Sequence, residues 1–261
     1  DKLFSVRDDV FEKVELLGRR TAEMHLALLS DKKNKDFKPE KFNDEYITWL
    51  QGHLNRLLVK RINLLKENYA RLDKNAKALA DDFISSEKVI ERFFEKIGCN
   101  DLKSSRIRIH GDYHLGQVLF TGSDYLIIDF EGEPESSITD RKIKHSPLKD
   151  VAGMIRSFHY AVCSKLYFSN ETKGVDPQRL QKAADRWYKL ITDAYIDAYM
   201  HTMGDISATF GSRTELNFLL QLHLLEKAVY ELGYELNGRP DWIRIPLKGI
   251  QHVLFEIEKF N

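Results

Sequence analysis

The spacing of apolar side chains constrains this chain most, because it follows a helical period over most of the 261 residues. Between residues 6 and 29, apolar residues recur every three or four positions, as on one face of an α-helix. The same spacing predicts helices at 44–80, with one interruption, and at 86–98, where Gly98 is expected to end the helix in a left-handed cap. The first hundred residues are therefore expected to be mainly helical.

Helical spacing returns in the second half of the chain. Ser146 is expected as the N-cap and Pro147 as the first residue of a helix that runs to about Phe168. Three more helices are expected at about 177–201, 214–237 and 247–259.

One segment between these halves has a different pattern. Residues 118–120 and 125–129 are apolar and rich in β-branched residues, and the Thr-Gly-Ser-Asp sequence between them is a turn signal. We expect a β-hairpin, preceded by a short extended piece. The fold class is thus mainly α with a small β-hairpin insertion. Loops held by a rigid scaffold often carry function, so the hairpin is the expected site of chemistry.

The loops at this hairpin match the pattern of phosphoryl-transfer enzymes. Such enzymes need a carboxylate for the proton of the attacking hydroxyl and oxygen ligands for Mg²⁺. In "HGDYHLGQ", Asp112 stands two residues after His110 and Gln117 five after Asp112, as in H-R-D-x-x-x-x-N. In "IIDFEG", Asp129 takes the place of the aspartate of D-F-G. We predict Asp112 as the base and Gln117 with Asp129 as magnesium ligands.

Two alternatives at this site stay open. Either half of the pattern alone would also suit loop polar groups or hairpin-end caps, whereas both halves in order favour a kinase-like site. Glu131 follows Asp129 closely and is expected either to help bind the metal or to pair with Arg141.

Composition excludes some classes of partner. The chain has 40 basic and 40 acidic residues, which gives no electrostatic case for nucleic acid or a membrane surface. No run of 18 apolar residues occurs, and the first residues lack the core of a signal peptide. We expect a cytoplasmic protein.

A second cluster of polar residues lies in the last third of the chain. In "LLEKAVYELGYEL", a lysine, two tyrosines and a glutamate fall on one helical stripe: Lys227, Tyr230, Glu231 and Tyr234. Sugars offer C–H faces to aromatic rings and hydroxyls to charged groups, so this stripe suits a sugar. The alternative is that the tyrosines pack in the core with satisfied hydroxyls.

The chain resembles the maltokinase family in several segments: "LLGRRTAEMHLAL", "HGDYHLGQVL", "DFEGEP", "SPLKDVAGMIRSF" and "LEKAVYELGYELNGRPDWIRIPLKGI". These bacterial enzymes belong to the aminoglycoside-phosphotransferase-like kinases and are sometimes fused to trehalose synthase. The resemblance implies a protein-kinase-like C-terminal lobe. It also implies transfer of the γ-phosphoryl group of ATP, with Mg²⁺, to the anomeric hydroxyl of maltose, giving maltose 1-phosphate.

The resemblance also implies roles for further residues. Asp150 matches an aspartate that braces the catalytic loop by accepting backbone N–H bonds, or serves the helix N-terminus, or both. His114 lies on the catalytic loop and is expected to support its geometry, or to bind the metal or one of the metal's ligands. Lys227, Tyr230 and Tyr234 are expected to bind the disaccharide, with Glu231 beside them, and Arg239 in "GRPDW" to line its rim.

The chain offers no candidate for the N-terminal lobe that such kinases use to hold ATP. It has no glycine-rich phosphate loop and no V-A-I-K-like strand before its first helix. We therefore expect a kinase-like C-terminal lobe over 1–261 with three parts: 1–105 helical, 106–134 catalytic loop and hairpin, and 146–261 helical and acceptor-binding. The missing lobe, and a fused or associated trehalose synthase, are the expected partners, and the isolated chain is expected to be inactive.

Other functions remain possible from the residues alone. Another small-molecule kinase of the same superfamily would act on an aminoglycoside, choline or homoserine. A third possible function is that of a non-catalytic lobe that docks a trehalose synthase domain. The intact set of Asp112, Gln117 and Asp129 argues against this function.

Overall fold

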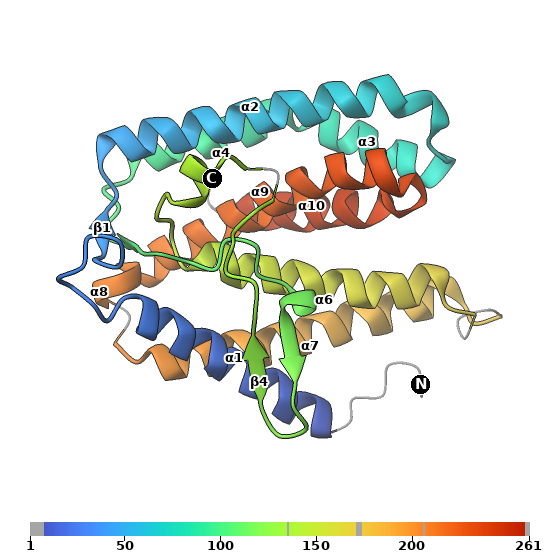
Figure 1. Ribbon diagram of the computed structural model, residues 1–261. Coiled ribbons are helices and arrows are strands. Elements are labelled where there is room, and N and C mark those ends of the chain that lie inside the picture. The colour runs from blue at the N-terminus through green and yellow to red at the C-terminus, as the bar shows by residue number, and fades with distance from the viewer. Residues whose placement is uncertain (1–7, 135, 171–173, 206, 259–261) are drawn as a thin grey trace. The chain divides into compact units, whose positions relative to one another are not determined.

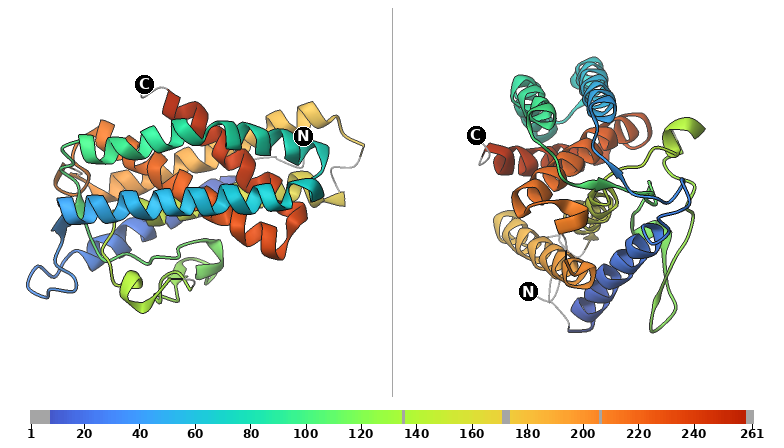
Figure 2. Two further views of the ribbon diagram at one scale, coloured as in Figure 1. Left: turned by 90° about the horizontal axis from the view of Figure 1, so that it is seen from above. Right: turned by 90° about the vertical axis from the view of Figure 1, so that its left-hand side faces the viewer.

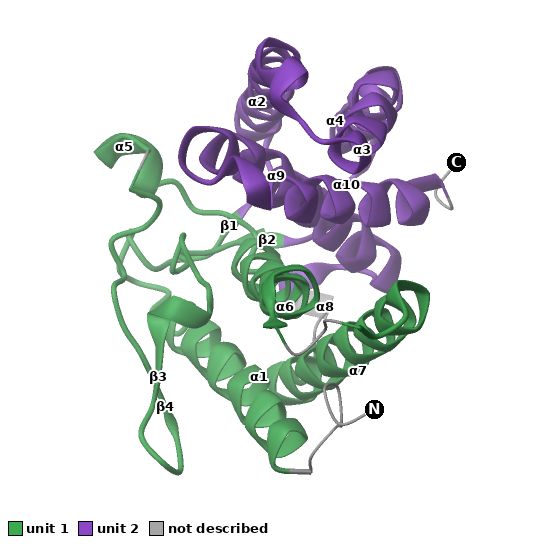
Figure 3. Cartoon of the chain, turned by 90° about the vertical axis from the view of Figure 1, so that its right-hand side faces the viewer, with its two compact units in different colours: residues 1–40, 105–208 green, residues 41–104, 209–261 purple. Residues whose placement is uncertain are grey.

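The computed structural model describes residues 8–134, 136–170, 174–205 and 207–258. The described residues are mainly α-helical, which confirms the fold class expected from the apolar spacing (Figure 1). They fall into two compact units, residues 1–40 with 105–208 and residues 41–104 with 209–261 (Figure 3). Each unit is described by itself below. The expected three-part division and the expectation of an absent N-terminal lobe stay predictions.

The first unit is built on three long helices. They are α1 (Asp8–Leu28), α6 (Leu148–Phe168) and α7 (Pro177–Met203), and a single turn, α5 (Ile138–Arg141), precedes α6. Helix α7 packs against both α1 and α6. Gly18 permits the close approach of α1 to α7, because a Cβ there would lie 2.5 Å from the carbonyl oxygen of Tyr195.

The hairpin belongs to this unit and lies beside α1 (Figure 2, right). Strands β3 (Val118–Phe120) and β4 (Tyr125–Ile127) pair antiparallel, with Val118 opposite Ile127 and Phe120 opposite Tyr125. Gly122 in the turn has a φ of +101°, which a residue with a side chain rarely adopts. The predicted hairpin is thus confirmed, with its second strand ending two residues earlier than expected.

The described part of the second unit is mainly helical. Its elements are α2 (Asp44–Asn68), η2 (Tyr69–Arg71), α3 (Lys74–Ser85), α4 (Glu87–Cys99), α9 (Arg213–Gly238), η5 (Pro240–Trp242) and α10 (Arg244–Ile257). Helix α9 packs against α2 and α10, α10 also packs against α3, and α2 runs beside α4 (Figure 2). The expected interruption of the 44–80 segment falls at η2 and the turn after it.

Three short elements lie where the chain passes from one unit to the other. Strands β1 (Glu40–Lys41) and β2 (Ser105–Arg106) pair with each other, and α8 (Ser207–Phe210) is a single turn. None of the described helices combines the length and apolar character that crossing a bilayer requires.

Two predicted helix ends were wrong. Helix α4 continues through Gly98 and ends at Cys99, and its C-cap is Asn100 with a φ of −90°, so no left-handed cap forms. Gly98 instead lies close to the side-chain amide of Gln51. The second is the start of α6, which begins at Leu148 with Pro147 as its N-cap residue. The Ser146 hydroxyl still accepts the Leu148 N–H (3.3 Å).

Candidate active site

A glycine turn carries the backbone into Asp112. Gly111 has a φ of +89°, in the left-handed region that glycine adopts without strain. A Cβ at Gly111 would lie 3.1 Å from the Cα of Gly132, in the loop after the hairpin. The lack of a side chain therefore lets these two loops approach closely.

The side chain of Asp150 binds the backbone of this turn. Its carboxylate accepts the backbone N–H of His110 at Oδ2 (2.7 Å) and that of Gly111 at Oδ1 (2.9 Å). Asp150 lies in the first turn of α6 and is only 1% exposed. The geometry agrees with the bracing role that the resemblance implied.

A histidine from α1 completes the surroundings of this carboxylate. His25 Nε2 lies 3.1 Å from Asp150 Oδ2. Burial works to raise the pKa of Asp150, but the hydrogen bonds from His25 and from the N–H of Gly111 outweigh it and hold the pKa below the ordinary value. Asp150 is therefore a buried carboxylate that stays ionised.

His110 links the loop to the end of the hairpin. Its Nε2 lies 2.8 Å from the carbonyl oxygen of Ile128, and its Nδ1 accepts the backbone N–H of Asp112 (3.3 Å). These partners assign the ring proton to Nε2, because a carbonyl can only accept and a backbone N–H can only donate. One buried ring thus contacts the residue next to Asp129 and the backbone of Asp112.

Asp112 itself is partly open to solvent, with 15% of its side chain exposed. Oδ2 lies 3.8 Å from Nε2 of His114. His114 is the N-cap of a short 3₁₀ helix, η3 (Leu115–Gln117), where Nδ1 accepts the N–H of Gly116 (3.0 Å). His114 therefore shapes the loop between Asp112 and Gln117, and its role toward a metal stays a prediction.

Gln117 and Asp129 meet at the open end of the hairpin. The Nε2 of Gln117 donates to Asp129 Oδ2 (2.9 Å), and the Ile128 N–H donates to the Gln117 carbonyl (3.0 Å). Asp129 has a φ of +65°, and it is the only residue other than glycine with a positive φ in the described ranges. Such strain is often found at functional sites.

These two side chains fit part of a magnesium site. Carboxylate and amide oxygens are hard donors that Mg²⁺ accepts, and rotating the Gln117 amide by 180° turns its oxygen to where its nitrogen now lies. The described part of the chain holds no cluster of three His, Cys, Asp or Glu side chains arranged as a metal site. Magnesium at phosphates commonly uses only one or two carboxylates, so Gln117 and Asp129 remain compatible with it.

Glu131 lies exposed after Asp129. Its expected partner Arg141 bonds elsewhere: the guanidinium donates to the carbonyl oxygens of Ser136 (3.0 Å) and Pro134 (2.7 Å). The first alternative, a pairing of Glu131 with Arg141, is not found among the described residues. The second alternative, a role in binding the metal, stays a prediction.

The predicted sugar stripe lies on α9, in the second unit. Lys227 and Tyr230 are half-buried, with the ammonium 5.0 Å from the ring centroid, and Tyr234 is 56% exposed. Arg61 of α2 also lies over the Tyr230 ring, at 5.5 Å. Tyr234 is thus exposed at the surface of this unit, whereas the half-buried Tyr230 fits both the sugar-binding prediction and the alternative of a packed ring.

The remaining members of the stripe differ in burial. Glu231 is 9% exposed, whereas Arg239 is exposed and pairs with Glu235 through two hydrogen bonds of 3.0 and 2.7 Å. The Arg239 guanidinium also lies over the rings of Trp242 (4.4 Å) and Tyr234 (5.4 Å). Arg239 is therefore held beside the aromatic stripe, and its role at the rim of a sugar site stays a prediction.

Sequence reasoning missed two groups of residues. His25 gave no signal, because its partner Asp150 is 125 positions away. In the second unit, His223 Nδ1 lies 2.8 Å from the buried Glu226, which is also 3.4 Å from His53. The i,i+3 spacing of His223 and Glu226 is a signal that could have identified this pair.

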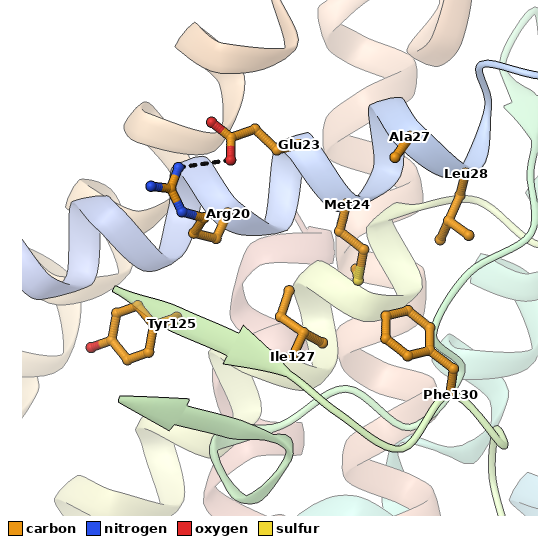
Figure 4. Close-up of a pocket in the computed structure, with 8 residues that line it drawn as sticks. All are labelled: Arg20, Glu23, Met24, Ala27, Leu28, Tyr125, Ile127 and Phe130. Atoms are coloured by element: carbon orange, nitrogen blue, oxygen red, sulfur yellow. Dashed lines mark hydrogen bonds and ion pairs between the residues drawn. The ribbon is translucent and has the colours of Figure 1, made fainter. Parts of the chain in front are cut away.

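A cavity of about 360 Å³ lies between α1 and β4. Figure 4 shows Met24 of α1 facing Ile127 and Phe130 of the hairpin. Arg20 closes one side of it, paired with Glu23 (2.7 Å) and Asp124 (2.7 and 3.1 Å). The cavity is mostly apolar and lies against the residue that follows Asp129.

Comparison with known proteins relates the chain to glucosamine kinases. It is 28% identical over 142 residues to glucosamine kinase of Streptacidiphilus jiangxiensis, covering 54% of this chain and 30% of that protein. It is also 28% identical over 151 residues to glucosamine kinase of Mycolicibacterium smegmatis, covering 56% and 34%. The match spans about a third of the length of these curated relatives. No protein-family model matches the chain.

Solved structures extend the similarity to nearly the whole chain. A crystal form of glucosamine kinase matches with a TM-score of 0.75 at 20% identity, over 95% of this chain and 54% of that one. A complex of glucosamine kinase with glucosamine, ADP and inorganic phosphate matches with a TM-score of 0.76, over 95% and 56%. The chain therefore shares the fold of about half of glucosamine kinase.

These comparisons contradict the prediction that the protein phosphorylates maltose. The relatives and solved structures described above are glucosamine kinases, not maltokinases. The physical reason is that a fold and a phosphotransfer loop do not specify the acceptor, which depends on a few groups in its pocket.

Proposed function

We propose that this chain is the acceptor-side lobe of an ATP-dependent phosphotransferase that acts on a sugar hydroxyl. The observation that carries the proposal is the arrangement of Asp112, Gln117 and Asp129 around one hairpin, braced by the buried carboxylate of Asp150. A purely structural loop would not need a partly exposed carboxylate and a strained aspartate at the ends of one hairpin, with a buried ionised group bound to the same loop. The similarity to glucosamine kinases supports the same class of reaction.

Asp112 is the proposed base. In the reaction, the sugar hydroxyl oxygen forms a bond to the γ-phosphorus, the bond from that phosphorus to the β–γ bridging oxygen breaks, and ADP leaves. The proton of the hydroxyl passes to Asp112, whose carboxylate orients the attacking oxygen. His110 and Asp150 hold the backbone of Asp112 in place while this happens.

Gln117 and Asp129 are the proposed ligands of a magnesium ion. When bound, Mg²⁺ neutralises the charge that develops on the phosphate oxygens. The Asp129 carboxylate lies beside the Gln117 amide, and a 180° rotation of that amide would bring its oxygen to the same side of the hairpin end as the carboxylate.

We propose an aminoglycoside-phosphotransferase-like C-terminal lobe as the fold type. The chain matches about half of each solved glucosamine kinase, so contacts to ATP are proposed to come from the portion that it does not match. Membership of the maltokinase family stays a prediction.

The acceptor is proposed to be a sugar, with glucosamine as the first to test. The relatives supply this choice, and Lys227, Tyr230 and Tyr234 supply a positive charge, a half-buried ring and an exposed ring that suit a sugar. An aminoglycoside, choline or homoserine remain the comparison substrates.

The test is an ADP-release assay with the full-length protein and ATP. Glucosamine, other sugars, an aminoglycoside, choline and homoserine are compared, with Asp112→Asn as the inactive control. Turnover with a sugar that falls by about 10²-fold or more in Asp112→Asn supports the proposal. Turnover only with a non-sugar acceptor would refute the acceptor class. If calorimetry detected no magnesium-dependent binding of a nucleotide to the full-length protein, the alternative of a non-catalytic docking lobe would be favoured instead.

A further inference from the structure

Two polar clusters lie buried one helical turn apart in the first unit. In the first, the Thr21 hydroxyl contacts the hydroxyls of Tyr113 (2.9 Å) and Tyr195 (3.1 Å). In the second, the two ring nitrogens of His25 contact Tyr199 (2.9 Å) and Asp150 (3.1 Å). Thr21 and His25 are four residues apart on α1, so both face the same side of that helix.

We propose that His25 is a positioning residue that holds the Asp150 carboxylate in the orientation in which it binds the backbone of the Asp112 loop. Its effect on catalysis rests on the proposed function, whereas its effect on the loop does not. His25 touches neither Asp112 nor Asp129 in this arrangement, and acts through Asp150 alone.

The first step of the argument concerns the carboxylate. Three donors converge on Asp150: two backbone N–H groups and the Nε2–H of His25. His25 and the His110 N–H share Oδ2, while the Gly111 N–H takes Oδ1. A carboxylate that lost the His25 donor would be held by the two backbone N–H groups alone and would be less well compensated for its burial.

The second step concerns the orientation of the histidine. Burial raises the pKa of Tyr199 well above its ordinary value, so its phenol stays protonated and can donate to Nδ1. With Nδ1 accepting, the ring proton lies on Nε2 and points to Asp150. His25 is fully buried, so water cannot replace it as a donor to the carboxylate.

The third step follows the carboxylate to the chemistry. Gly111 is the residue immediately before Asp112, and its N–H is fixed by Asp150. The other N–H belongs to His110, whose ring reaches the carbonyl of Ile128, next to Asp129. A single buried group thus fixes the backbone beside both proposed functional aspartates.

The first cluster supplies a matched control. Tyr195→Phe removes one buried hydroxyl between the same two helices, α1 and α7, and leaves the contacts of His25 with Tyr199 and Asp150 in place. If removing any buried polar group here simply destabilised the protein, variants of both clusters would show the same effect. A specific effect on the loop should follow only from His25.

Two kinds of variant separate the two nitrogens of His25. His25→Asn places its amide near the position of Nδ1, so it keeps the reach to Tyr199 and loses Asp150. His25→Gln extends its amide to the position of Nε2, so it can still donate to Asp150. His25→Leu is a second loss variant, which fills more of the volume if His25→Asn does not fold.

The experiment measures amide hydrogen exchange in the full-length protein, at the peptide that contains His110 and Gly111. We expect exchange there to be at least about tenfold faster in His25→Asn or His25→Leu than in Tyr195→Phe. An increase of this size is expected when a hydrogen bond to a charged group is lost. His25→Gln should return it to near the wild-type rate. In the ADP-release assay, the loss variants should lower kcat with little change in KM for ATP, and His25→Gln should restore it.

Equal exchange at this peptide in the His25 loss variants and Tyr195→Phe would overturn the proposal, as would failure of His25→Gln to restore protection. The exchange readout does not depend on activity. If no acceptor were phosphorylated by the wild-type protein, the proposed function would fail, while the exchange result would still decide the role of His25.

Discussion

The side-chain amide of Gln117 donates a 2.9 Å hydrogen bond to the carboxylate of Asp129 across the open end of the hairpin. The two residues are 12 positions apart, and they meet because Gln117 precedes β3 and Asp129 follows β4. This contact is the point at which the hairpin turns two sequence signals into one candidate metal site.

Asp129→Asn tests this site without changing its backbone. Asparagine tolerates a positive φ and keeps an acceptor for the Gln117 amide, but it lacks the charge that attracts Mg²⁺. We expect near-wild-type thermal unfolding, and an activity of the full-length protein that falls at least about tenfold and needs more magnesium. Asp129→Ala should also lower stability, by about 1 kcal/mol, because alanine does not tolerate this φ. An unchanged magnesium dependence in Asp129→Asn would remove Asp129 from the metal site.

Asp150→Asn tests the buried brace through stability. An asparagine offers one acceptor oxygen where three donors converge, so at least one buried N–H is left unsatisfied, at a cost of about 1–3 kcal/mol. The measurement is the free energy of unfolding in urea at pH 7, with Tyr195→Phe as the control for a buried polar change. A variant as stable as the wild type would show that the carboxylate does not hold the loop.

The pH dependence of this difference has a definite sign. The folded-state pKa of Asp150 lies below its unfolded value of about 3.9, so its contribution to stability is fully present above that value and is lost as the pH falls through the folded-state pKa. The stability gap between the wild type and Asp150→Asn should therefore shrink as the pH falls below about 4. A gap that stayed constant down to pH 3 would contradict an ionised Asp150.

Gly153→Ala tests the close packing of α6 under the loop. A Cβ at Gly153 would lie 2.5 Å from the carbonyl oxygen of Tyr113, so the backbone next to Asp112 must move. We expect a loss of about 1–3 kcal/mol in the free energy of unfolding. Gly52→Ala is the control, because its Cβ would meet only the flexible end of Arg56 (3.1 Å) and it gains helix propensity. Equal stabilities of the two variants would refute this close contact.

Tyr234→Ala tests the sugar stripe on α9. Tyr234 is 56% exposed, so its removal should not affect folding, but it should raise KM for the sugar by about tenfold while KM for ATP stays the same. Phe255→Ala on α10 is the matched control, since Phe255 is 64% exposed and outside the stripe. A similar KM for the sugar in both variants would place the acceptor elsewhere.

Local signals predicted much of the fold. The Thr-Gly-Ser-Asp turn and the apolar runs on either side gave the hairpin, because turn chemistry and strand pattern act within a few residues. The helix ends were less well predicted. Gly98 was expected to end α4, but the helix continues past it and the close Gln51 side chain comes from another helix, α2. Such a contact depends on packing that the local sequence does not contain.

The site was predicted where the sequence spacing itself encodes the geometry. Gln117 and Asp129 meet because a hairpin joins them, whereas His25 reaches Asp150 only through the packing of helices 125 positions apart. The acceptor was predicted wrongly, because it depends on the exact shape of a pocket and not on a motif. The burial of individual side chains along α9 could not be predicted from their spacing. Glu231 is 9% exposed, whereas Tyr234, three residues later, is 56% exposed.

The most direct test of the account is the rate of ATP-dependent phosphorylation of glucosamine and other sugars by the full-length protein and by its Asp112→Asn variant. The account predicts that the wild type phosphorylates a sugar and that Asp112→Asn, with unchanged thermal unfolding, loses about 10²-fold or more in kcat. A folded Asp112→Asn variant with near-wild-type kcat would contradict the central role assigned to this loop.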